Sequence, residues 1–336
     1  MNTLFMIGNG FDKNLGLKTS YSEFYQYYLG IPSNNEIIIR FKQEIKKQQI
    51  TDWADLELAL GAYSVKFDNE KDYIFLINDV SRKLKAYLEK EQNSYNYDVG
   101  FEFVKDELNN YHKHLSKANQ EFRMKFIKKE TNENFNNINI INFNYTDTVD
   151  KIINRSLPLQ FQVSNNNKYI NTYVRELINV HGKLNDSMIL GVNDETQIKN
   201  DKLRTEKVKN YIVKPTMNIN AETLREKECE KLISEANIVV IYGMSIGETD
   251  KCWWELLMKK FLEDPSMLII IVNYDSEYDP SFKHFFVEKK DELKNKLIKY
   301  LIKDNYENHK IAKERILVEF NTNMFKFNVK RDRNVA

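Results

Sequence analysis

The chain contains several short, uninterrupted apolar runs, and each run ends in a glycine or a polar side chain. The clearest cover residues 4–7, 238–242 and 267–272, and a similar run over 138–143 is interrupted by Asn139 and Asn142. Runs of this length without polar alternation are typical of strands buried on both faces, as in parallel sheets. Helical patterns separate the later runs. This alternation predicts an α/β fold with a doubly wound, mostly parallel, Rossmann-like sheet.

Further elements follow from the same patterns. We expect strands at 176–180 and 188–190 and a terminal hairpin over 316–329. Helical periodicity of the intervening segments predicts helices over 146–154, 199–210, 221–235, 250–262 and 281–301.

The segment between the first two strands is helical in pattern almost throughout. Ser20 and Glu23 match a capping box for a helix through Tyr28, and Asp52 can cap a helix that carries Trp53. Three-and-four spacing of apolar residues continues over 73–88 and 98–129. We therefore expect a Rossmann-like nucleotide-binding core formed by 1–19 and 131–336, with residues 20–130 as a helical inserted subdomain.

Glycine is scarce, with ten in 336 residues against about 7% in average proteins, so its positions are informative. Gly8 and Gly10 flank Asn9 directly after the first strand. This spacing lets backbone N–H groups approach a phosphate. Lys13 replaces the third glycine of the dinucleotide fingerprint, so a plain tight turn is the alternative. Asp12 has two interpretations, a helix cap or a group that faces the ligand.

A second glycine motif, Gly243-Met244-Ser245-Ile246-Gly247, follows the strand at 238–242. Gly243 and Ser245 can present backbone and hydroxyl donors to another phosphate. The alternative is an ordinary loop in which Thr249 or Asp250 caps the next helix. The string also matches a serine-hydrolase elbow, but that pattern requires an acid and then a histidine downstream. Downstream His284 lies in no supporting pattern.

Three more strand ends carry polar side chains. Asn144 and Tyr145 follow the second strand, His181 follows the third, and Asn273 follows the strand at 267–272. Ligands of doubly wound sheets bind beyond the carboxyl ends of the strands, so these groups should converge on one crevice. Imidazole titrates near neutral pH, which makes His181 a candidate base, with a buried structural histidine as the alternative. Asn144 can orient a water or a ribose hydroxyl, or serve as a turn residue.

Composition excludes several function classes. Fifty basic and 49 acidic residues give a net charge of +1, which disfavours a protein that binds nucleic acid through phosphate contacts. Two cysteines and no His, Cys or carboxylate cluster at ligand spacing predict no metal site and a reducing compartment. No signal-peptide pattern and no membrane-length apolar run is present, so we expect a cytoplasmic protein without a membrane partner.

These motifs together resemble the bacteriophage abortive-infection AbiH family. The resemblance spans nearly the whole chain and rests on five segments. They are Ile7-Gly8-Asn9-Gly10-Phe11-Asp12, Trp53-x-x-Leu56-Glu57, Phe143-Asn144-Tyr145-Thr146-Asp147, His181-Gly182 and Tyr242-Gly243-Met244-Ser245. It implies an antiphage effector that kills or stalls an infected bacterial cell before phage are released. A phage-derived trigger and a homo-oligomer are partners that such a role implies.

The order of motifs is also similar, more distantly, to sirtuin-like NAD-binding proteins. By position, that similarity implies that Gly8 and Gly10 hold the NAD diphosphate and that Ser245 contacts phosphate. Asn144 would engage the nicotinamide ribose or a water, His181 would act as base, and Asn273 would bind the adenosine ribose. The two cysteine pairs of the sirtuin zinc module are missing, and the first loop reads Asn-Gly-Phe-Asp rather than Ala-Gly-x-Ser. Protein deacylation is therefore disfavoured.

Two functions remain from different classes. In the first, the protein binds NAD as substrate, with no tightly bound cofactor, and hydrolyses its nicotinamide glycosidic bond through Asn144 and His181. In the second, it is a non-catalytic sensor that binds NAD or a related adenine nucleotide and acts on a partner. A nucleic-acid-cleaving toxin is the weakest alternative because no metal cluster is predicted.

Overall fold

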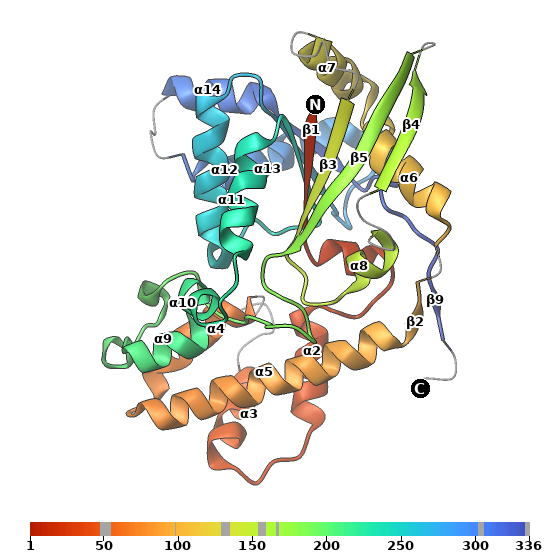
Figure 1. Cartoon of the computed structure of the whole chain (residues 1–336). Helices are drawn as coiled ribbons and strands as arrows, with labels where there is room; N and C mark the ends of the chain where they lie inside the picture. The colour runs from red at the N-terminus through yellow and green to blue at the C-terminus, as the bar shows by residue number, and fades with distance from the viewer. Residues whose placement is uncertain are drawn as a thin grey trace.

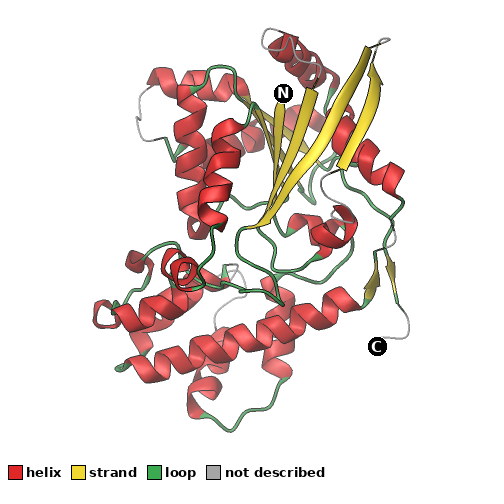
Figure 2. Ribbon diagram, in the orientation of Figure 1, coloured by secondary structure: helices red, strands yellow, loops and turns green. Residues whose placement is uncertain are grey.

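The computed structural model describes residues 1–47, 55–97, 99–128, 135–153, 159–165, 168–301 and 306–332. A seven-stranded sheet forms its centre, in the order β4-β5-β3-β1-β6-β7-β8 (Figures 1 and 2). The strands are β1 (Asn2–Ile7), β3 (Phe135–Asn142), β4 (Leu159–Asn165), β5 (Lys168–Asn179), β6 (Ile238–Tyr242), β7 (Leu268–Asn273) and β8 (Ile316–Phe320). A separate two-stranded sheet pairs β2 (Tyr95–Asn96) with β9 (Lys330–Arg331).

Six neighbouring strands of the central sheet run parallel, and only the edge strand β4 is antiparallel to its neighbour. Taken in chain order, the parallel strands are arranged 3-2-1-4-5-6, which is the Rossmann order. The order reverses between β1 and β6, the point at which ligands bind in such sheets. The expected α/β, Rossmann-like fold is confirmed. The strand β4 was not expected from the sequence.

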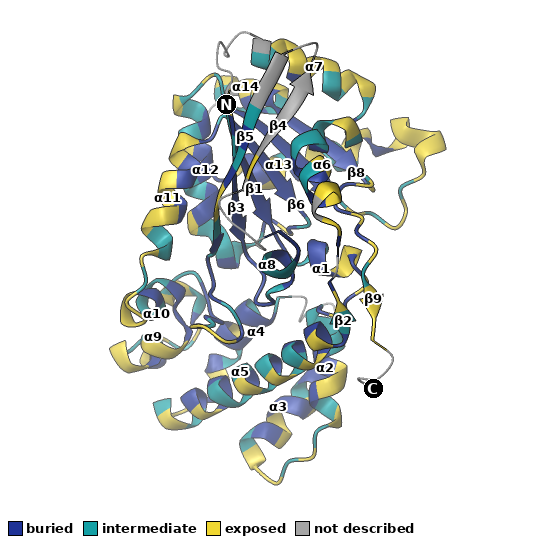
Figure 3. Ribbon diagram, turned by 45° about the vertical axis from the view of Figure 1, so that its right-hand side comes forward, coloured by how far each residue is buried: buried dark blue, intermediate teal, exposed yellow. Residues whose placement is uncertain are grey.

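Helices cover both faces of the sheet, as a doubly wound fold requires. On one face, Leu4 and Met6 of β1 pack in a core with α11 (Arg225–Glu235), α12 (Lys251–Glu263), α13 (Val287–Ile298) and α14 (Tyr306–Arg315). On the other face, Phe5 and Ile7 pack in a core with α1 (Gly10–Asn14), α6 (Phe101–Asn110) and α8 (Thr148–Ile153). Figure 3 shows the buried strands between these layers. The helix α7 (Lys117–Lys128) follows α6 on that second face.

A third apolar cluster forms a helical layer beyond the carboxyl ends of the strands (Figure 1). It contains residues of α2 (Tyr21–Gly30), α3 (Glu36–Lys47), α4 (Leu56–Tyr63), α5 (Glu70–Asn93) and α9 (Glu206–Ile212). The helix α10 (Lys214–Asn220) begins directly after Val213 of this cluster and contacts α9. The layer therefore combines the segment after β1 with the crossover between β5 and β6. Because α6 packs on the sheet instead, the segment 20–130 has two packing partners. Its division from the core as a subdomain remains a prediction.

Local sequence signals explain several boundaries and fail at others. Ser20 and Glu23 form the expected capping box at the start of α2. Asp52 and Trp53 lie outside the described residues, and Asp55 caps α4 by accepting from the N–H groups of Glu57 and Leu58.

Two expected elements are wrong. Residues 188–190 form no strand, because they follow a tight turn in which Lys183 pairs with Asp186. The expected hairpin over 316–329 is also not formed. Its first part is the parallel strand β8 beside β7, and the chain then leaves the sheet so that Lys330 and Arg331 pair with β2.

Candidate functional site at the carboxyl ends of the strands

Asn144 and His181 lie together where β3 and β5 meet the helical layer. The ring of Phe143 packs edge-on against the imidazole of His181, with ring centres 5.5 Å apart. The ring of Tyr145 lies 6.2 Å from the same imidazole. Asn144 therefore lies in the chain between two residues whose rings both contact His181. That Asn144 and His181 act together on one ligand remains a prediction.

Within the described part of the chain, the amide of Asn144 is buried and has no hydrogen-bond partner. The residue is 5% exposed, and both its Oδ1 and its Nδ2 lack a partner among the described residues. Its backbone is held, because the Asn144 N–H donates to Oδ1 of Asn142 over 3.1 Å. A buried polar group left unpaired costs about 1–3 kcal/mol. Such groups are rare in native structures, and each needs an explanation, such as a catalytic role or a bound water or ion.

His181 is also buried, and one of its ring nitrogens is paired. Its Nε2 lies 2.8 Å from Oδ1 of Asp250. Its Nδ1 has no partner among the described residues. Burial and the nearby ammonium of Lys214 lower the pKa of His181, and Asp250 opposes this shift. The imidazole is therefore neutral at neutral pH and carries a free lone pair.

Lys214, at the start of α10, links Asp250 to a second buried carboxylate. Its Nζ lies 2.9 Å from Asp250 Oδ1 and 2.9 Å from Glu57 Oε2, and it donates to the carbonyl of Thr249. Glu57 also accepts a hydrogen bond from the hydroxyl of Tyr145. An unbroken polar chain thus runs from His181 through Asp250, Lys214 and Glu57 to Tyr145.

The charges in this chain shift one another's protonation. Burial raises the pKa of Asp250, but Lys214 and His181 outweigh it and hold that pKa well below the ordinary value. Burial lowers the pKa of Lys214, but the two carboxylates raise it above the ordinary value. For Glu57, burial dominates over Lys214 and raises the pKa to about 7. The site therefore contains an ionised Asp250, a charged Lys214 and a Glu57 that titrates near neutral pH.

The sequence did not assign Glu57, Lys214 or Asp250 to the site. Glu57 belongs to the segment Trp53-x-x-Leu56-Glu57, but nothing in that segment indicates what Glu57 does. Asp250 was expected as a helix cap, and it occupies the N-cap position of α12 without a capping bond from its side chain. Lys214 is one of 50 basic residues, and no local pattern distinguishes it. Their proximity arises because α4 and α10 pack beneath the strand ends, which no short motif encodes.

Asp12 joins the loop after β1 to the loop after β3. The carboxylate is 1% exposed, and it accepts hydrogen bonds from Thr146, over 2.6 Å, and from Thr148. Burial raises the pKa of Asp12 to about 6. Asp12 lies inside α1, whose N-cap position is Asn9, and its carboxylate connects the two strand ends instead of capping that helix. That Asp12 faces a ligand remains a prediction.

The glycine loops after β1 and β6 pack directly against each other. The N–H of Gly8 donates to Tyr242 and the N–H of Gly10 donates to Gly243, over 2.9 and 2.8 Å. A Cβ on Gly10 would lie 2.4 Å from the Cα of Gly243, so contact between the two backbones explains these glycines. The Asn9 side chain is held by Thr19. A phosphate at this loop remains a prediction, and it would depend on N–H groups other than those of Gly8 and Gly10.

The remaining predicted residues lie at the edges of this region. Ser245 is exposed in the loop after β6, and Asn273 is the half-buried last residue of β7. Gly182 has a φ of +70°, and a Cβ there would lie 2.0 Å from the carbonyl oxygen of Ser187. Its role is therefore to form the tight turn after His181, rather than to leave space beside the imidazole.

The described residues show neither a metal cluster nor a membrane-spanning helix. No group of three or more His, Cys, Asp or Glu side chains in them is arranged to hold a metal ion. No helix in the described part of the chain combines the length and hydrophobicity that crossing a bilayer requires.

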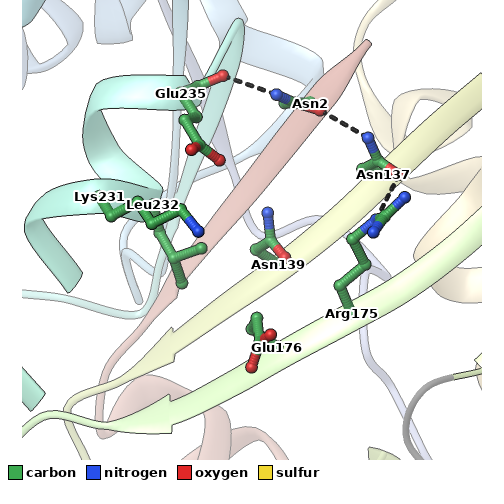
Figure 4. A pocket seen from close by; sticks show the side chains of 8 residues that line it. All are labelled: Asn2, Asn137, Asn139, Arg175, Glu176, Lys231, Leu232 and Glu235. Atoms are coloured by element: carbon green, nitrogen blue, oxygen red, sulfur yellow. Dashed lines mark hydrogen bonds between the residues drawn. The ribbon is translucent and has the colours of Figure 1, made fainter. Parts of the chain in front are cut away.

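A polar pocket lies under α11, beside the amino-terminal halves of β1 and β3 and beside Arg175 and Glu176 of β5 (Figure 4). Along one side of it, Asn2, Asn137 and Arg175 are joined by hydrogen bonds. It is separate from the strand ends that carry Asn144 and His181.

Comparison with known proteins identifies the family. No curated protein matches the chain. A family model described as "Bacteriophage abortive infection AbiH" matches residues 4–274, which include all five strand ends considered above. The chain therefore belongs to the bacteriophage abortive-infection AbiH family.

Proposed function

We propose that this protein is an abortive-infection effector that binds NAD at the carboxyl ends of β3 and β5 and hydrolyses its nicotinamide glycosidic bond. Membership of the AbiH family supports the defensive role. One observation carries the enzymatic part. Asn144 and His181 are both buried, and the residues on either side of Asn144 contact the His181 ring. Each of the two retains polar atoms without a partner among the described residues. Groups arranged in this way are suited to hold and activate a small polar reactant.

The charge of the surrounding side chains supports a cationic reacting centre. Asp250, Glu57 and Asp55 lie close together, and Lys214 is the basic group that bridges the first two. The nicotinamide ring of NAD is positively charged, and so is the oxocarbenium-like state that forms when it leaves. Carboxylates in a buried site stabilise developing positive charge more strongly than they would in water.

The reaction we propose consumes one water. The bond between C1′ of the ribose and the pyridinium nitrogen breaks, and its electron pair leaves with nicotinamide, which becomes neutral. Water oriented by the Asn144 amide adds to C1′, and its proton passes to His181. The products are nicotinamide, ADP-ribose and one proton. Acid–base assistance of this type contributes typically ~10²–10⁴-fold to a rate.

Incubating the purified protein with NAD and measuring nicotinamide release tests this function. We expect release by the wild type and a loss of about 100-fold or more in His181→Ala and in Asn144→Ala. The matched controls are His284→Ala and Asn210→Ala, because both residues are exposed and neither belongs to the polar chain of the site. The assay should be repeated with lysate of phage-infected cells, since a phage-derived trigger is part of the proposal. Unchanged release in both site variants contradicts the assignment.

Nucleotide binding without turnover would favour the sensor instead. The buried ion pairs between α4, α10 and the loop after β6 support that alternative, because they connect the strand ends to the helical layer. Isothermal titration with NAD and with ADP-ribose distinguishes the two functions. Saturable binding with no nicotinamide release, in the presence of infected lysate, would assign the protein to sensing.

A further inference from the structure

The pairing of His181 with Asp250 determines which ring nitrogen can act as a base. The contact of 2.8 Å between His181 Nε2 and Asp250 Oδ1 requires one hydrogen between the two atoms. If Nε2 were unprotonated, two lone pairs would face each other at that distance. Asp250 cannot supply the hydrogen, because Lys214 and His181 keep its carboxylate ionised.

Addition of a second proton to the His181 ring, which would make it an imidazolium, is disfavoured in this buried site. His181 is 4% exposed, and the Nζ of Lys214 lies 3.5 Å from its Nε2. The charged groups that face the ring are Asp250 and Lys214, with Tyr145 against its face and Arg225 and Glu57 farther away. Nδ1 therefore keeps its lone pair, and it is the nitrogen that has no partner among the described residues.

We propose that Asp250 is a positioning residue that holds His181 as the Nε2–H tautomer, and so makes Nδ1 the atom that takes the proton from the attacking water. The role in turnover rests on the proposed function, whereas the tautomer does not. The arrangement follows the general logic of an acid that orients a histidine base. Lys214 contributes by keeping Asp250 ionised and fixed through its bonds to Asp250 and Thr249.

Nitrogen NMR of protein labelled at histidine tests the tautomer directly. The wild type is expected to show His181 neutral, with hydrogen on Nε2 and none on Nδ1, and His181→Gln identifies its signals among the five histidines. In Asp250→Asn, the amide can donate to the ring, so the Nδ1–H form should become populated. Asp250→Glu keeps a carboxylate and should retain the Nε2–H form. Asp291→Asn is the control, since this carboxylate lies on α13 and pairs with Lys313.

Turnover is measured on the same proteins. We expect Asp250→Asn to lower kcat by ~10²–10⁴-fold with a much smaller change in KM, because substrate contacts remain while the base is misprotonated. Asp250→Glu should recover part of kcat, and Asp291→Asn should match the wild type.

The outcomes separate the two proposals. Hydrogen on Nδ1 in the wild type overturns the positioning role even if NAD is hydrolysed. An Asp250→Asn protein with an unchanged tautomer and unchanged kcat overturns it as well. The expected tautomer and its shift in Asp250→Asn, without nicotinamide release by any protein, support the positioning of His181 and overturn NAD hydrolysis. If Asp250→Asn does not fold, the wild-type tautomer and Asp250→Glu still decide the question.

Discussion

Two pairs of strand ends meet at the same edge of the sheet, and they differ in how their polar groups are used. At the ends of β1 and β6, the N–H groups of Gly8 and Gly10 are bonded to the opposite loop, and backbone contact fills the space of the missing side chains. At the ends of β3 and β5, the Asn144 amide and His181 Nδ1 are buried without partners among the described residues. The first pair is satisfied internally, whereas the second retains groups that a ligand could satisfy.

This difference shows that the glycine loops, although they are the most conspicuous motif in the sequence, need not contain the reactive groups. Scarce glycines indicated a nucleotide loop, but close packing of two backbones also requires glycine. Single polar residues after β3 and β5 gave weaker signals in the sequence. They gain importance because α4 and α10 bring Glu57 and Lys214 against them.

The largest expected effect tests whether the ion pairs of the site are structural. Lys214→Ala leaves Asp250 and Glu57 buried without their shared counter-ion, so we expect a loss of about 3–5 kcal/mol in the free energy of unfolding. Urea denaturation measures it. Lys289→Ala is matched, because Lys289 also bridges two carboxylates but at the surface, where solvent screening should make the loss much smaller. Equal losses in the two variants would mean that the buried ion pairs of Lys214 stabilise the fold no more than the surface ion pairs of Lys289 do.

Protonation of Glu57 gives the next prediction. Its pKa is raised from 4.5 to about 7 in the folded protein, so the native state binds more protons than the unfolded state between these values. The contribution of Glu57 to stability should therefore be largest below pH 4.5 and fall as pH rises to about 7, by up to about 1.4 kcal/mol per pH unit. Subtracting the stability of Glu57→Gln from that of the wild type, pH by pH, isolates this contribution. A difference that rises with pH would mean that Lys214 outweighs burial.

A substitution in the glycine loops tests the packing explanation. Gly10→Ala places a Cβ 2.4 Å from the Cα of Gly243, and overpacking of this kind costs about 1–3 kcal/mol. Gly30→Ala is the control, because nothing lies within 4 Å of its added Cβ, and it should be neutral or slightly stabilising. Thermal unfolding of both variants compares them. If Gly10→Ala unfolds at the same temperature as Gly30→Ala, close backbone contact does not explain why residue 10 is glycine.

The smallest effect compares two neighbouring asparagines. Asn142 donates to Asn179 over 2.7 Å and accepts from the N–H of Asn144, so Asn142→Ala should cost about 1–3 kcal/mol. Asn144→Ala removes an amide without a described partner, and should leave stability unchanged or raise it by up to about 1 kcal/mol. Chemical denaturation of both proteins checks the sign. A large loss in Asn144→Ala would show that its amide is satisfied in solution.

Much of the fold could be predicted because it depends on local patterns. Apolar runs located β1, β3, β6 and β7, and the capping box at Ser20 located α2. The predictions failed where strand pairing between segments far apart in the chain decides the structure. Residues 316–329 alternate like a hairpin, but Ile316–Phe320 pairs with β7 and the following chain reaches β2. The edge strand β4 depends on pairing with β5, and its own residues gave no clear signal.

The site divides in the same way. The sequence by itself determined the buried parallel strands, the polar residues at their ends and the family, because each is carried by a contiguous segment. Only the tertiary structure decided that Glu57, Lys214 and Asp250 join His181, that Asp250 pairs with the ring instead of capping α12, and that the glycine loops pack on each other. The physical reason is that charge pairing, burial and unpaired polar atoms depend on distances between segments far apart in the chain. Hydrophobic periodicity specifies where a strand ends, but not which side chains surround that end.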